Sequence, residues 1–147
     1  MGSLDFDFPD DVCKLLEDIA NDDGLVIECL ESVRDITRDS VEKELHRFDA
    51  TGEMANSVKC TPPTQNKDGN GYHIFARPTG YSEHTYNRTN KKGDETKYKV
   101  GNGLKAVWLQ YGNSHQSPRP WLESAKANCE DETIDRMQEV INKRIGD

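Results

Sequence analysis

The sequence predicts an α+β fold: a small antiparallel sheet packed by a long helix from the N-terminal half and by a C-terminal helix, with a long polar arm. Three observations carry this prediction. Apolar residues recur at three- and four-residue steps over residues 25–48 and 120–145, as in amphipathic helices. Residues 57–61 and 71–77 alternate apolar and polar side chains, as strands do. Residues 79–103 are polar for most of their length.

The composition favours one structural domain over residues 1–147 with a thin core. Hydrophobic residues make up only 33% of the chain and charged residues 31%. Two interpretations stay open: apolar surface is buried against partner subunits, or a long polar loop dilutes the composition. The net charge is −8, and no long apolar run is present, so neither a signal peptide nor a membrane span is expected.

The four cysteines, Cys13, Cys29, Cys60 and Cys129, are widely spaced and form no Cys-x-x-Cys pair. This spacing indicates free thiols in a reducing compartment rather than a disulfide framework or a zinc site.

The first elements are a short lead and a helix. Residues 1–8 are predicted to be a flexible lead, in which Phe6 and Phe8 either pack on the first helix or dock on a neighbouring subunit. Residues 9–21 are predicted to form a helix, since a proline and an aspartate suit its first turn. An Asp-Asp-Gly step ends this helix at Gly24.

The longest predicted helix spans residues 25–48, and a turn at residues 49–52 follows it. Thr51 is expected to cap one short helical turn after that turn. The apolar face of the long helix comprises Val26, Leu30, Val33, Thr37, Val41, Leu45 and Phe48.

Residues 57–61 and 71–77 are predicted to form two strands joined by a hairpin-type turn. The connecting residues 66–71 contain Asp-Gly and Asn-Gly steps, which favour tight turns. A calcium loop is a weaker interpretation of this run, because alternating acids and a distal glutamate are missing.

The polar segment 79–103 is interpreted as an assembly arm that becomes ordered on contact with adjoining subunits. A loop of this length is usually functional or disordered. Two alternatives remain: a mobile hairpin extension, and a site for single-stranded nucleic acid, since tyrosines are interleaved among cations. Residues 97–100 are expected to pair as a third strand, closed by residues 101–103. The predicted assembly contacts are Tyr81, Tyr86, Arg88, Lys91, Lys92 and Tyr98.

DNA is not expected to be the primary ligand, because polyphosphate binding needs clustered cations. The one basic cluster is diluted by Asp94 and Glu95. Its members are Arg88, Lys91, Lys92, Lys97 and Lys99.

A helix, a corner and a second helix are predicted over residues 104–145. Leu104, Val107, Trp108 and Tyr111 have the spacing of one apolar helix face. Gly112 ends this helix, and two prolines stiffen the corner that follows. The packing corner comprises Trp108, Tyr111, Gly112, Arg119, Pro120, Trp121 and Leu122. The last helix begins at Pro120 and places on one face Leu122, Ala125, Cys129, Met137, Val140 and Ile141.

No catalytic chemistry is predicted. His46, His73, His84 and His115 are far apart in the sequence, and no nucleophile, phosphate-binding or metal-ligand motif accompanies them. We therefore expect a protein that is not an enzyme and that uses no catalytic residues, no cofactor and no metal.

Two short motifs resemble the gene-ten-like family of tailed-phage proteins. The first is Thr51-Gly52-Glu53-Met54-Ala55-Asn56-Ser57-Val58, which is similar to the Thr-Gly-x-Leu-x-x-Ser-Ile motif of that family. The second comprises Gln110, Tyr111, Gly112, Asn113, Ser114, Arg119, Pro120, Trp121 and Leu122. The family usually has Glu in place of Gln110 and Thr in place of Asn113. The resemblance runs from the second predicted helix to the C-terminus.

The resemblance implies a structural virion protein that forms a ring at the head–tail interface, as a tail-completion, neck or head–tail joining component. The expected partners are further copies of the same chain, a hexamer being favoured over a dodecamer, and the adjoining connector and tail proteins. DNA would pass through the ring only as cargo, and no membrane is involved. The expected location is the virion, after assembly in the host cytoplasm. The alternatives are a tail terminator ring and a non-virion binding module that uses the Tyr/Lys-rich arm for nucleic acid or protein.

Overall fold

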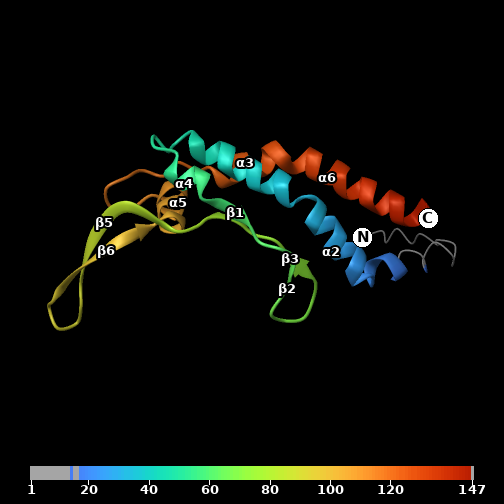
Figure 1. Ribbon diagram of the computed structural model, residues 1–147, viewed down its shortest axis with the longest axis horizontal. Coiled ribbons are helices and arrows are strands. Elements are labelled where there is room, and N and C mark those ends of the chain that lie inside the picture. The colour runs from blue at the N-terminus through green and yellow to red at the C-terminus, as the bar shows by residue number, and fades with distance from the viewer. Residues whose placement is uncertain (1–13, 15–16, 147) are drawn as a thin grey trace, which may run out of the picture.

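The computed structural model describes Lys14 and residues 17–146 (Figure 1). The predicted lead over residues 1–8, and most of the first half of the helix predicted for 9–21, lie outside these residues, whereas 17–20 are helical. The fold is α+β, as predicted. Its elements are α2 (Asp23–Ser32), α3 (Arg34–His46), α4 (Glu53–Asn56), β1 (Val58–Cys60), β2 (Thr64–Gln65), β3 (Tyr72–His73), β4 (Ala76–Pro78), β5 (Tyr81–Thr89), β6 (Glu95–Gly101), α5 (Asn102–Tyr111) and α6 (Leu122–Gly146).

Helices α2, α3 and α6 form one layer, in which α6 runs back along α3 and α2 (Figure 1). The continuous helix predicted for residues 25–48 is wrong, because Val33 separates α2 from α3 with φ −108° and ψ 2°. The Ser32 hydroxyl donates to the carbonyl of Cys29 at 2.7 Å, and the Val33 N–H donates to the carbonyl of Leu30 at 3.3 Å. A serine side chain thus takes the acceptor that the continuing helix would use.

Buried polar side chains tie α6 to α3. The Ser40 hydroxyl donates to the carbonyl of Ala125 at 2.6 Å. Glu44 is buried, and its carboxylate accepts from the Asn128 amide at 2.8 Å and from the Arg47 guanidinium at 2.9 Å. These partners compensate the cost of removing a charge from water.

The predicted hairpin forms as two short antiparallel pairs instead of two continuous strands. β1 pairs with β4, with Val58 opposite Pro78, and β2 pairs with β3 nearer the turn. The turn at residues 66–71 is confirmed, since the Asn66 N–H donates to the carbonyl of Gly71 at 3.0 Å. Pro62 and Pro63 separate β1 from β2, because proline supplies no N–H to a ladder.

Segment 79–103 contains a second hairpin, in which β5 pairs with β6. The strand expected at residues 97–100 is confirmed as part of β6, and within the described residues it pairs with β5 and not with the strands of the first hairpin. Tyr86 stands directly opposite Tyr98, with ring centroids 5.8 Å apart. Asn90 closes the turn by accepting the N–H groups of Lys92 and Asp94 on its side-chain oxygen. Of the expected closing residues 101–103, Gly101 ends β6, whereas Asn102 and Gly103 already belong to the first turn of α5.

The core is small and lies where α3, α4, β1, α5 and the start of α6 meet (Figure 1). The hairpin β5–β6 leaves this region at the end of the molecule opposite the C-terminus (Figure 1). The buried cluster comprises Val41, Leu45, Met54, Ala55, Val58, Ala106, Leu109, Trp121 and Ala125.

Candidate assembly surfaces

Trp121 and Gln110 lock the corner between α5 and α6. Trp121 is 7% exposed, and its indole N–H donates to the carbonyl of Ala106 at 2.9 Å. The side-chain oxygen of Gln110 accepts the backbone N–H groups of Trp121 and Leu122, both at 3.0 Å. The start of a helix leaves such N–H groups without helical partners, so Gln110 acts as the cap of α6. The predicted start of this helix at Pro120 is therefore two residues too early.

Gly112 makes the sharp exit from α5. Its φ is +78°, a backbone region that favours glycine. A Cβ at this position would lie 2.8 Å from the carbonyl oxygen of Gln116 and 2.9 Å from Cδ of Pro118. The corner therefore needs glycine both for its backbone angle and for space.

The apolar face predicted for α5 is not the face that enters the core. Leu104, Val107 and Tyr111 are 38%, 50% and 70% exposed, whereas Ala106 and Leu109 are buried. Trp108 is half-buried. The prediction is wrong because Ala106, whose carbonyl accepts from the Trp121 indole, and Leu109 form the core-facing side of α5, so Leu104, Val107 and Tyr111 remain outside.

An apolar groove of about 410 Å³ lies between α5, β4 and the start of α6. Val107 and Tyr111 of α5 line one part of it, together with the exposed Leu122 and the buried Pro78. Ala106 and Trp121 contribute buried residues to the lining, and Arg77 supplies a charge. The hydrogen bonds of Gln110 and Trp121 hold these walls in place, so the groove is already formed in the single chain. We call it the α5 groove.

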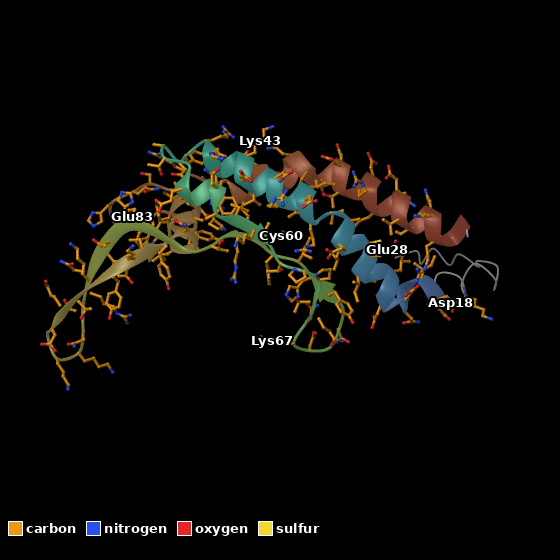
Figure 2. All side chains as sticks on the ribbon, viewed as in Figure 1. Asp18, Glu28, Lys43, Cys60, Lys67 and Glu83 are labelled. Atoms are coloured by element: carbon orange, nitrogen blue, oxygen red, sulfur yellow. The ribbon has the colours of Figure 1, made fainter. Side chains whose placement is uncertain are left out.

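The predicted assembly contacts all lie on the hairpin β5–β6, but the structure does not gather them into one patch. Tyr81, Tyr86, Arg88, Lys91, Lys92 and Tyr98 are all exposed. Arg88, Lys91 and Tyr98 line a pocket of about 270 Å³ near the turn, whereas Tyr81 is at the opposite end of β5. Along the hairpin, side chains project to both sides of the ribbon, with Glu83 labelled near its base (Figure 2).

Asp49 organises the short helix α4, a role that the sequence prediction assigned to Thr51. Its Oδ2 accepts the N–H groups of Met54 at 2.7 Å and Ala55 at 3.0 Å, whereas the Thr51 hydroxyl accepts only from Glu53 at 3.3 Å. Burial opposes ionisation of Asp49, but these two N–H groups, the Thr51 hydroxyl and the charge of Lys105 together hold the pKa of the carboxyl below its ordinary value.

The charges are segregated along the chain. Residues 77–122, which include the hairpin β5–β6 and α5, contain eight Lys or Arg and three Asp or Glu. The remaining sequence contains eleven Lys or Arg and twenty-four Asp or Glu. The end of the molecule that carries the hairpin and the α5 groove is therefore cationic, and the layer of α2, α3 and α6 is acidic.

Three further observations concern metal, thiol and membrane chemistry. Within the described residues, no group of three or more His, Cys, Asp or Glu side chains is placed to hold a metal ion. Cys29, Cys60 and Cys129 are free, and burial raises the thiol pKa of Cys29 and Cys60. No helix in the described part of the chain combines the length and apolarity needed to cross a membrane.

Comparison with protein-family models, curated proteins and solved structures finds no match to this chain.

Proposed function

We propose that this chain is a structural, non-catalytic subunit of a tailed-phage virion that forms a ring at the head–tail interface, in a tail-completion, neck or joining role. The observation that carries the proposal is the exposed apolar surface around the α5 groove. Val107 and Tyr111 are at least half exposed, although the chain has few large apolar side chains to place. A rigid apolar surface of this kind is typical of protein interfaces.

The hairpin β5–β6 supports the same proposal. An isolated two-stranded hairpin is only marginally stable in water, and both of its edges retain unpaired backbone groups. Within the described residues, β5 and β6 pair only with each other. Contact with neighbouring subunits would therefore stabilise this hairpin, as expected of an assembly arm.

Complementation of a phage whose gene for this chain is disrupted tests the role of the hairpin. In one variant, residues 86–98 are replaced by Asn-Gly, so that a two-residue turn joins Thr85 to Lys99, which are paired in the hairpin. This excision keeps the buried residues Ser82 and Val100. We expect the variant to fold and to retain the helical bands of the parental circular dichroism spectrum, but to yield few infectious particles.

The matched control is Lys67→Ala, which changes the exposed tip of the other hairpin (Figure 2). It is expected to restore parental titres. Parental titres from the excised variant would remove the hairpin from the mechanism.

A second candidate function is a binding module for single-stranded nucleic acid, and the basic pocket near the hairpin turn favours it. Arg88, Lys91 and Tyr98 combine cations with an aromatic ring, as such sites do. Steeply salt-dependent binding of a single-stranded oligonucleotide, lost on replacement of Arg88 and Lys91 by Gln, would favour this candidate. Tail termination is a further candidate within the virion class, and it predicts over-long tails when the protein is absent.

A further inference from the structure

We propose that the α5 groove binds the outer face of α6 of a second copy of this chain, centred on Ile134. This inference deepens the proposed ring function and rests on it. It assigns both halves of one subunit contact to named residues.

The first half is the α5 groove itself. Its walls are apolar, and Arg77 provides a cation beside them. The hydrogen bonds around Trp121 fix its shape before any partner arrives. A preformed groove avoids part of the ordering cost of association.

The second half is an apolar side chain set among acids in the middle of α6. Ile134 is 57% exposed. Glu130 and Asp131 precede it by four and three residues, so they share its helix face. Both are exposed, and neither forms an ion pair with any described residue, although Arg136 nearby pairs with Glu139. Adjacent acids repel each other unless a cation is close.

These two surfaces are complementary in both chemistry and charge. The groove offers an apolar lining with an arginine, and α6 offers an isoleucine with two carboxylates. They occur on different parts of one chain, so the contact is head-to-tail and can repeat around an axis. Such heterologous contacts generate rings when the rotation closes. The segregation of charge between residues 77–122 and the remainder of the chain favours the same orientation.

Sedimentation velocity of the purified full chain over a concentration series tests the contact. Val107→Asp changes the groove, and Ile134→Asp changes the facing helix. Both side chains are at least half exposed, so neither substitution disturbs the core. Each is expected to weaken self-association by at least about tenfold, because a charge then replaces an apolar contact at the centre of the interface.

Ile145→Asp is the matched control, because Ile145 lies on the same helix and is 48% exposed. It is expected to associate like the parent. A charge exchange adds specificity: Arg77→Glu and the double change Glu130→Lys with Asp131→Lys should each weaken association. The combination of all three changes should restore it.

The possible results of these experiments distinguish a failure of the proposed contact between the α5 groove and α6 from a failure of the ring proposal. A parent chain that associates, together with Val107→Asp and Ile134→Asp variants that associate equally well, would overturn this contact and leave the ring proposal standing. A parent chain that remains monomeric at every concentration would overturn both. Loss of association in the two variants but no restoration by the charge exchange would contradict the assignment of Arg77 to the acids of α6.

Discussion

At the scale of single residues, the corner after α5 depends on one glycine. Gly112 combines a positive φ with close contacts to the Gln116 carbonyl and the Pro118 ring. The sequence could indicate a helix end there, because glycine commonly occupies that position. It could not indicate the steric crowding, because the crowding atoms belong to Gln116 and Pro118, which fold back against Gly112 after the next turn.

Gly112→Ala is expected to lower the free energy of unfolding by about 3 kcal/mol, because backbone strain and a steric clash act together. Gly69→Ala is the control, since Gly69 has the same φ of +78° but no atom within 4 Å of the added Cβ. That variant should lose only about 1 kcal/mol. Urea unfolding of both proteins measures the difference, and equal losses would mean that the clash is absent.

The roles of Ser40 and Glu44 could not be predicted, because a local sequence pattern does not distinguish a buried polar side chain from an exposed one. Ser40 and Glu44 lie on the buried face of α3, although the sequence pattern includes neither in its apolar face. Their partners, the Ala125 carbonyl and the Asn128 amide, come from α6, more than eighty residues later in the chain. A local sequence pattern does not indicate a hydrogen-bond partner that lies so far along the chain.

At the scale of elements, periodicity located the helices but not always their buried faces. For α6 the predicted stripe is partly correct, since Ala125 is buried and Cys129 half-buried, while Leu122 is exposed. For α5 the apolar stripe faces outward, because the spacing of residues determines which side chains share a face but not which face the rest of the chain covers. The mismatch at α5 is itself the main evidence for a docking surface.

For the hairpin β5–β6, the sequence predicts only part of the strand pairing. It indicates a polar arm over residues 79–103, with pairing only near residues 97–100. The strands form because Tyr86 and Tyr98 meet across the ladder and Asn90 closes the turn. These contacts depend on register, which an unbroken polar segment does not reveal. Whether this hairpin contacts neighbouring subunits stays a prediction.

The short helix α4 provides a pH-dependent test at this scale. Its first N–H groups are held by the ionised Asp49 carboxylate, whose pKa is lowered in the folded chain. This stabilisation is present above the unfolded pKa, about 3.9, and is lost as the pH falls through the folded value. Asp49→Asn should therefore lower the free energy of unfolding by about 1 kcal/mol at pH 7, because hydrogen bonds to a charged acceptor are stronger than those to a neutral one.

Below about pH 4 the stability of the Asp49→Asn variant and that of the parent should converge. Thermal unfolding between pH 3 and pH 7 measures the two curves. Asp68→Asn, in the exposed turn between β2 and β3, controls for the replacement of an aspartate by an asparagine. A constant difference between Asp49→Asn and the parent at all pH values would contradict the role of the charge.

At the scale of the whole molecule, the fold separates a cationic end with an exposed apolar groove from an acidic helical layer. The α+β class followed from periodicity alone, because long helices and alternating strands leave clear patterns. The distribution of charge was readable from the sequence as well. The sequence does not show, however, that the cationic segments lie together at one end of the molecule. This arrangement is visible only in the folded structure (Figure 1).

We propose that this chain assembles into the junction between phage head and tail. Electron microscopy of a lysate from a phage whose gene for the chain is disrupted tests this assembly role. We predict DNA-filled heads and finished tails that lie unjoined, and joined particles when the parent chain is supplied in trans. Normal virions in the absence of the chain would contradict the claim.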